Sequence, residues 1–170
     1  MFQPRASIVL AVYNGGMFLE RKLNSLLALD YPAGRSEILV VSDGSTDATD
    51  EIAQRYADLG VRLLRLPHGG KAAALNATLA HLSGEIVFFT DVRQPVDREA
   101  LRHLAANFAD PTVGAVTGEL RIMDAVSGEQ ADLDLYWRYE LWVRSHHSRI
   151  DSLFNTTGCL YACLLYTSPS

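Results

Sequence analysis

The sequence predicts a single α/β domain with a mostly parallel central sheet and helices on both of its faces. Two observations lead to this prediction. Apolar segments of strand length alternate five times with segments of helical periodicity, and these apolar segments are continuous, which is typical of strands that are buried on both faces. No repeat, low-complexity tract or linker divides the 170 residues, and this length is sufficient for one domain with a sizeable core.

The first half of the chain supplies two strand–helix units. Residues 6–12 form an apolar run that ends in the turn sequence YNGG, and leucines at helical spacing follow until the sequence DYP ends the helix. Residues 37–44 predict the second strand. The helix after it carries Asp47, Asp50 and Glu51 in its expected first turn, where the helix dipole favours them. Its buried face is expected to hold Ile52, Ala53 and Tyr56.

Three further strands are predicted in the second half, over residues 61–66, 85–90 and 113–122. Between the first two lies an alanine-rich helix, GGKAAALNATLAHL (69–82), which opens with glycine. Asp97 is expected to cap the next helix, because its side-chain oxygen can accept an N–H group of the first turn. The apolar stripe of that helix is made by Leu101, Leu104, Ala105 and Phe108.

The alternation of strands and helices stops after residue 122. Residues 128–132 predict a loop, and residues 133–147 predict an aromatic-rich helix that is apolar on more than one side. We interpret this segment as the start of an acceptor-side subdomain, not as a separate domain. Its aromatic side chains predict a surface that packs against a further part of the protein; an acceptor-sugar platform and a membrane-facing surface are the alternatives.

The composition disfavours several classes of protein. Hydrophobic residues make up 48% and charged residues 21% of the chain, as in ordinary soluble globular proteins. The net charge of −5 argues against nucleic acid as a partner. No run approaches the roughly 20 apolar residues that cross a bilayer, and no signal segment opens the chain. Cys159 and Cys163 are too few for a disulfide framework and a poor zinc site, so we expect a reducing, cytoplasmic compartment.

Polar side chains follow the predicted strands at the point where each strand ends. Tyr13 and Asn14 follow the first strand, and Asp43 follows the second. Asp91 follows the fourth, and Lys71 opens the helix after the third. Ligands of open parallel sheets bind outside the carboxyl ends of the strands, where these residues converge. Each of them alone also has a structural explanation, since Asn-Gly and Asp-Gly form turns and Asp caps helices.

The chemistry of this edge suits a nucleotide. Asp43 and Asp91 can accept hydrogen bonds from a base or from ribose hydroxyls. Lys71, in a Gly-rich turn at a helix N-terminus, can face a base or a diphosphate. The sequences GxGxxG after the first strand and GxxxxGK[ST] are absent, which disfavours dinucleotide dehydrogenases and P-loop NTPases. His68 is interpreted as an ordinary loop residue.

Six segments, in this order and with roughly these separations, resemble the inverting family 2 glycosyltransferases of the GT-A fold. They are SIVLAVYNGG, ILVVSDGSTDATDEIA, GGKAAALNATL, GEIVFFTDVRQP, VGAVTGEL and YWRYE. The most specific element is the pairing of SDGSTDAT with GKAAALN. The resemblance implies a Rossmann-like α/β/α sandwich of the nucleotide-diphospho-sugar transferases over residues 1–162, truncated at its C-terminal side.

The resemblance also implies a reaction. A sugar would pass from a nucleotide donor, usually a UDP-sugar, to a hydroxyl of a glycan or lipid-linked acceptor, with inversion at the anomeric carbon. The backbone around Val12, Tyr13 and Asn14 would cradle the nucleoside. Asp43 would contact the uracil ring or the ribose, and Lys71 would lie near the nucleotide.

Asp91 matches the first Asp of the family's DxD element, which holds the ribose and a divalent metal, Mg²⁺ or Mn²⁺, on the diphosphate. Arg93 replaces the second Asp, the family's usual direct metal ligand. Either the metal is held by Asp91 and the diphosphate oxygens, or the guanidinium supplies part of the positive charge. A surface ion pair of Arg93 with Asp97 is the structural alternative. We expect metal dependence to be weaker than with two carboxylates.

The family's general base is expected outside this chain. It is an Asp in an acidic ED element beyond the TGCLYA stretch, whereas Asp151, the last acidic residue here, precedes that stretch. The family pattern also predicts a basic continuation after Ala162, where this chain has CLLYTSPS. We interpret residues 163–170 as a non-native tail, of the kind that sequencing-adapter read-through adds, and leave them out of the predicted fold. A native apolar strand followed by a loop is the alternative.

These observations favour the donor half of a glycosyltransferase that is inactive without its base. The full-length protein would be cytoplasmic or bound to the cytoplasmic face of a membrane. A nucleotidyltransferase on a similar sheet is one rival, although it typically needs a basic residue in the first Gly-rich loop, where this chain has none before Arg21. A pseudo-enzyme that binds nucleotide sugar without turnover is the other, and Arg93 favours it.

Overall fold

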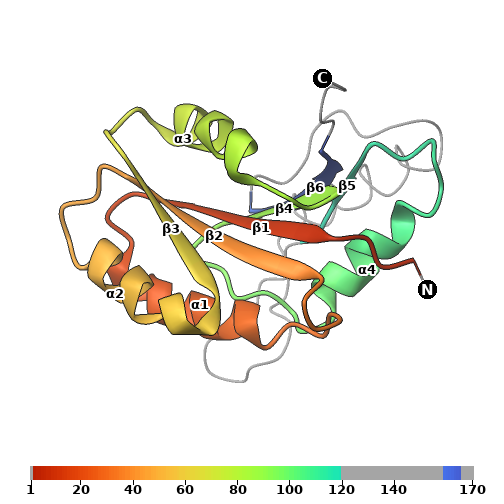
Figure 1. Ribbon diagram of the computed structural model, residues 1–170, viewed down its shortest axis with the longest axis horizontal. Helices are drawn as coiled ribbons and strands as arrows, with labels where there is room; N and C mark the ends of the chain where they lie inside the picture. The colour runs from red at the N-terminus through yellow and green to blue at the C-terminus, as the bar shows by residue number, and fades with distance from the viewer. Residues whose placement is uncertain (1, 120–158, 166–170) are drawn as a thin grey trace, which may run out of the picture.

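The computed structural model contains one six-stranded sheet (Figure 1) and describes residues 2–119 and 159–165. The strands are β1 (Ala6–Val12), β2 (Ser36–Asp43), β3 (Val61–Leu66), β4 (Ile86–Thr90), β5 (Ala115–Thr117) and β6 (Leu160–Leu164). Their order across the sheet is β3-β2-β1-β4-β6-β5. Strands β1 to β4 pair in parallel, and β6 is antiparallel to both of its neighbours. The prediction of a mostly parallel sheet is confirmed.

Helices cover both faces of this sheet, as predicted (Figure 1). They are α1 (Gly16–Leu27), α2 (Thr49–Arg55), α3 (Lys71–Thr78) and α4 (Ala100–Asn107), with short 3₁₀ turns η1 (Ala57–Leu59) and η2 (Leu79–His81). Helices α1, α2 and α4 pack on one face, and α3 lies on the other. None of the helices within the described residues has the length and hydropathy needed to cross a membrane.

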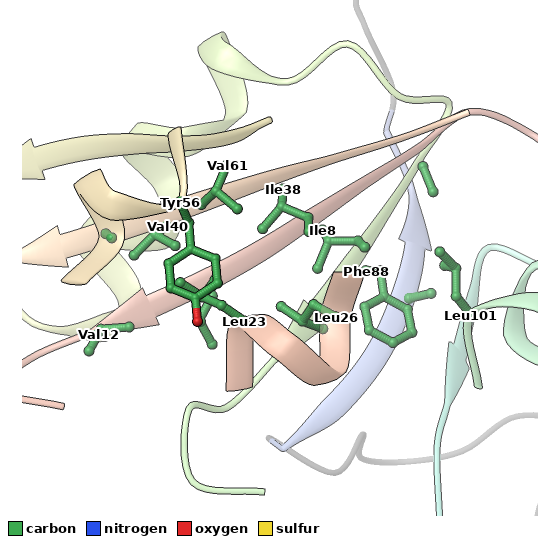
Figure 2. Packing of buried hydrophobic residues seen from close by; sticks show 14 of the residues in the cluster. Ile8, Val12, Leu23, Leu26, Ile38, Val40, Tyr56, Val61, Phe88 and Leu101 are labelled. Carbon is green, nitrogen blue, oxygen red and sulfur yellow. The ribbon is translucent and has the colours of Figure 1, made fainter. Parts of the chain in front are cut away.

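The larger core lies between the sheet and helices α1, α2 and α4 (Figure 2). Because side chains alternate along a strand, Ile8 and Val12 of β1 face this core, whereas Val9 faces α3. Leu23 and Leu26 of α1 pack against the inner face of the sheet (Figure 2). Each such side chain, when fully buried, contributes about 1.5–3 kcal/mol by leaving water. The sequences of the central strands are therefore apolar without interruption, because helices cover both faces of the sheet.

The sequence placed some helix boundaries imprecisely. Asp47 precedes α2 and does not lie in its first turn. The segment predicted as one helix over residues 69–82 is α3 followed by a 3₁₀ turn. The Asp97 carboxylate accepts the N–H of Glu99 at 2.8 Å, so it stabilises the turn that leads into α4. The stripe predicted on α4 is buried as expected.

The far end of the sheet differs most from the prediction. The fifth strand is shorter than expected, and residues 120–122 of its predicted span lie outside the described residues. Strand β6 includes Cys163 and Leu164, which pair with Val87 and Ile86 of β4. The alternative of an apolar strand at the start of residues 163–170 is therefore confirmed for these two residues, and leaving the whole tail out of the fold is wrong. Residues up to 165 therefore take part in the fold, while the non-native origin of residues 163–170 stays a prediction. The helix predicted over residues 133–147 and Asp151 lie outside the described residues.

Candidate functional site

A cleft of about 340 Å³ opens at the carboxyl ends of β1, β2 and β4, beside the N-terminus of α3. The seven residues that the sequence proposed for donor binding all line it. They are Val12, Tyr13, Asn14, Asp43, Lys71, Asp91 and Arg93. Residues far apart in the chain thus meet here because parallel strands end at the same edge of the sheet. Their individual binding roles stay predictions.

Asn14 joins the turns that follow β1 and β2. Its backbone is left-handed, with φ of +49°, a conformation that Asn tolerates better than most residues. Its N–H donates to Ser45 Oγ at 3.1 Å, and its Oδ1 accepts the N–H of Thr46 at 2.8 Å. The Asn14 carboxamide therefore holds the wall of the cleft in place.

Asp47 strengthens the same connection between the two turns. Its carboxylate accepts the N–H of Gly16 at 3.0 Å and the N–H of Thr49 at 3.0 Å, the first residues of α1 and α2. Burial raises the pKa of Asp47, but the hydrogen bonds from Thr49 and Gly16 outweigh it and lower that pKa below its ordinary value. One carboxylate thus stabilises the N-termini of two helices, and Gly15, the residue before α1, lines the cleft.

Asp43 is a buried carboxylate at the end of β2. Its two oxygens accept the N–H groups of Gly69 at 2.8 Å and Gly70 at 2.9 Å, directly before Lys71 opens α3. The structural alternative, in which Asp43 caps a helix, is wrong, since neither α2 nor α3 has a side-chain capping hydrogen bond; Asp43 instead stabilises the loop before α3. Asp43 also lines the cleft, so the same residue holds the loop that precedes Lys71 and forms part of the site.

His68 is a residue of the site region that the sequence analysis missed. Its Nδ1 lies 3.1 Å from Asp43 Oδ2, and its ring stacks on Tyr13 with the centroids 4.3 Å apart. Tyr13 is 53% exposed, so the pair offers an aromatic surface beside the cleft on which a planar base could stack. The available signal was its position directly before GGK, in the loop that follows β3.

Asp91 and Arg93 lie in the turn that follows β4. The Asp91 N–H donates to the carbonyl of Cys159 at 3.1 Å, and Asp91 Oδ1 accepts the N–H of Arg93 at 3.1 Å. Arg93 is exposed. The alternative that pairs it with Asp97 is not supported, since none of the ion pairs within residues 2–119 and 159–165 joins them.

The described residues contain no group of three or more His, Cys, Asp or Glu that could hold a metal ion. Both oxygens of Asp43 already accept backbone N–H groups. Asp91 is the other carboxylate that lines the cleft. A divalent ion fits here when diphosphate oxygens supply most of its ligands, because Mg²⁺ commonly binds through one or two carboxylates plus phosphates.

Lys22 is a second residue that the sequence analysis missed. It lies on the buried face of α1, only 1% exposed, and its Nζ donates to Thr90 Oγ1 at 2.6 Å and to the Gln94 carbonyl at 2.7 Å. Burial lowers the pKa of Lys22 from 10.5 to about 8, and nearby Asp91 and Cys159 oppose part of this decrease. The available signal was a lysine inside the leucine stripe of the predicted helix.

Comparisons with known proteins agree with this fold. The sequence profile of glycosyl transferase family 2 matches residues 7–165. The beta-monoglucosyldiacylglycerol synthase of Synechocystis sp. is 35% identical over 131 residues, which make up 74% of this chain and 26% of that protein. The chain spans about a quarter to a third of the length of the first curated relatives it matches.

Two solved structures with bound nucleotide sugar are also similar. The mannosyltransferase PcManGT from Pyrobaculum calidifontis, in complex with GDP-Man and Mn²⁺, superposes with a TM-score of 0.80 at 30% identity, over 96% of this chain and 45% of that one. The S. aureus protein TarS, in complex with UDP-GlcNAc, gives a TM-score of 0.61 at 28% identity, over 76% and 37%. With the sheet described above, these matches show that the chain belongs to glycosyl transferase family 2 and has the GT-A fold.

Proposed function

We propose that the chain forms the donor-binding part of an inverting glycosyltransferase, with a UDP-sugar as the preferred donor. The observation that carries this proposal is the convergence of two carboxylates and two cations, Asp43, Asp91, Lys71 and Arg93, on one cleft beside an exposed aromatic ring. The similar proteins TarS and PcManGT, solved with UDP-GlcNAc and with GDP-Man and Mn²⁺, support a nucleotide-sugar ligand.

The proposed donor lies with its base near Tyr13 and Asp43 and its diphosphate towards Asp91 and Arg93. Tyr13 stacks on the base, and Asp43 accepts a hydrogen bond from the base or ribose. Arg93 and Lys71 neutralise negative charge as the nucleoside diphosphate leaves, which lowers the barrier only if they are already in position. A divalent metal held by Asp91 and the diphosphate would supply further positive charge there.

The acceptor and the base belong to the rest of the proposed reaction. In a direct displacement with inversion, a carboxylate removes the proton of the acceptor hydroxyl as that oxygen attacks the anomeric carbon. Among the described residues, Asp43 and Asp91 are the carboxylates that line the cleft, and both are assigned to the donor. We therefore propose that the base lies outside the described residues, that this chain alone transfers sugar far more slowly than the full-length enzyme, and that the acceptor is a glycan or a lipid-linked sugar.

Calorimetric titration of the chain with UDP, UDP-GlcNAc, UDP-glucose and GDP-mannose tests the donor assignment. We expect UDP and at least one UDP-sugar to bind more tightly than GDP-mannose. With Mn²⁺ present, D91N should weaken UDP binding about tenfold or more, because Asp91 is the proposed protein ligand of a metal on the diphosphate. D58N, which removes an exposed carboxylate in η1 away from the cleft, should bind as the unchanged chain does. Absence of nucleotide binding, or equal effects of D91N and D58N, would contradict the proposal.

A second candidate is a binding domain without catalytic activity, and Arg93 favours it because the guanidinium stands where the family's metal ligand is expected. The full-length protein would then bind UDP-sugar. It would neither hydrolyse the donor nor transfer its sugar to an acceptor. Release of UDP by the full-length protein in a coupled assay would eliminate this candidate.

A further inference from the structure

The turn that carries Asp91 and Arg93 is anchored at both of its ends by one side chain. The Lys22 ammonium donates to Thr90 Oγ1, at the end of β4, and to the backbone carbonyl of Gln94. These two acceptors flank the segment 91–93. Lys22 therefore connects α1 to both ends of a turn whose middle lines the cleft.

A third contact restrains the same turn from the side of β6, where the Asp91 N–H donates to the Cys159 carbonyl. The segment is thus held by a cation from α1 and by the start of the antiparallel strand. The distances of 2.6 Å and 2.7 Å from Lys22 Nζ are those of strong charge-assisted hydrogen bonds. Such bonds leave little freedom for the backbone that positions Asp91 and Arg93.

The position of Lys22 is unfavourable for stability alone. Its helical neighbours Leu19, Leu23 and Leu26 are all buried in the core, and an apolar residue would satisfy the same stripe without burying a charge. Removing an ammonium from water is costly even when it is hydrogen-bonded. The core does not require a lysine at this position. Because Lys22 reaches the turn that carries two predicted site residues, its burial indicates a role in the site.

The charges around the turn point in the same direction. The Asp91 carboxylate has a buried cation, Lys22, on the protein side and an exposed cation, Arg93, two residues along the chain. One carboxylate with two cations leaves this part of the site positively charged, which suits a diphosphate.

We propose that Lys22 is a positioning residue for the diphosphate side of the donor: it holds the turn 90–94 so that Asp91 and Arg93 meet the diphosphate without rearrangement. This inference rests on the proposed function. Lys22 acts through the turn, since it is buried beneath it and does not line the cleft. It therefore affects a ligand that has phosphates and leaves a ligand without them unaffected.

The test compares UDP with uridine in Lys22→Met and in Arg21→Met. Each variant removes one positive charge from α1. Arg21 is exposed, whereas Lys22 is buried. UDP affinity is measured by calorimetry and uridine affinity by NMR titration. We expect K22M to weaken UDP binding about ten- to a hundredfold, as loss of a supporting contact typically does, with uridine affinity unchanged and R21M like the unchanged chain.

Thr90 supplies a second pair of variants in case K22M does not fold. Thr90→Val removes one of the two acceptors of Lys22 and keeps the shape, whereas Thr90→Ser keeps the hydroxyl. We expect T90V to weaken UDP binding severalfold and T90S to bind UDP as tightly as the unchanged chain does. Equal UDP affinity in K22M and R21M, equal affinity in T90V and T90S, or an equal loss for uridine and UDP would overturn the inference while leaving the proposed function intact. Failure of the unchanged chain to bind UDP would instead overturn both.

Discussion

The buried ammonium of Lys22 makes the stability of the chain depend on pH in a predictable direction. Its pKa is about 8 in the folded chain and 10.5 when exposed. The charged form is therefore disfavoured by folding, and this penalty approaches about 3 kcal/mol below pH 8, since one pKa unit corresponds to about 1.36 kcal/mol. Between pH 8 and 10.5 the unfolded chain binds more protons than the folded chain, so the penalty is relieved as the pH rises.

Lys22→Met removes this dependence and keeps a side chain of similar length. We expect the free energy of unfolding of the unchanged chain, relative to K22M, to rise by about 2–3 kcal/mol between about pH 7 and about pH 10. Titrating groups that do not interact with Lys22 act on both chains and cancel in the difference. Urea unfolding, monitored by circular dichroism at a series of pH values, measures this difference in unfolding free energy.

A direct titration provides the control. The chain contains two lysines, Lys22 and Lys71, so labelling with ¹³Cε-lysine gives two NMR signals, and the one absent from K22M belongs to Lys22. Its midpoint should lie near pH 8. A Lys22 signal that titrates at the usual lysine pKa, or stability curves of the two chains that stay parallel over this pH range, would refute the reasoning.

Three further predictions concern the cleft and the turn that follows β2. Arg93→Ala should weaken UDP binding about tenfold in the absence of metal and increase the relative benefit of Mn²⁺ in calorimetry; an absolute metal requirement of the unchanged chain would contradict a charge contribution from Arg93. Gly44→Ala should lower the free energy of unfolding by about 1–3 kcal/mol, because φ is +69° and the added Cβ would lie 2.7 Å from the backbone N of His68. Gly60→Ala is the control, because Gly60 has φ of +86° but no atom lies within 4 Å of the added Cβ, so this variant has backbone strain without a steric clash. An equal loss of unfolding free energy in G44A and G60A would show that the contact with His68 contributes nothing. Asp43→Asn should destabilise the chain by about 1–3 kcal/mol, because one amide oxygen cannot replace two oxygens that accept backbone N–H groups before α3; unchanged urea unfolding would show that these bonds are dispensable.

Much of the fold could be predicted because its signals are local. The strands of residues 6–12 and 61–66 have the bounds that the apolar runs predicted, and the site residues follow strand ends that must meet at one edge of a parallel sheet. Strand β6 was predicted only in part, as the alternative for residues 163–170, and its place between β4 and β5 was not predicted. Its partners β4 and β5 lie far away in the sequence, and antiparallel pairing at that distance leaves no periodic signal in the strand itself.

The two missed residues illustrate a different limit. A lysine is usually exposed, and only the three-dimensional position of Thr90 and Gln94 shows why Lys22 is buried. His68 lies in a short loop whose contacts with Tyr13 and Asp43 depend on the fold around it. Both residues act through partners on other elements, and such partners cannot be identified from one sequence pattern.

The antiparallel strand β6 also affects how the protein is made. Strand β4 and the turn with Asp91 are synthesised well before β6, and a ribosome adds only about 5–20 residues per second. For several seconds the nascent chain therefore has β4, rich in Ile, Val and Phe, without the strand that pairs with it on this side in the folded chain, and unpaired edges pair readily with other chains. The arrival of β6 both covers that edge and adds the Cys159 carbonyl that binds the Asp91 N–H. Protection from aggregation and completion of the turn that lines the cleft are thus expected to occur in the same late folding step.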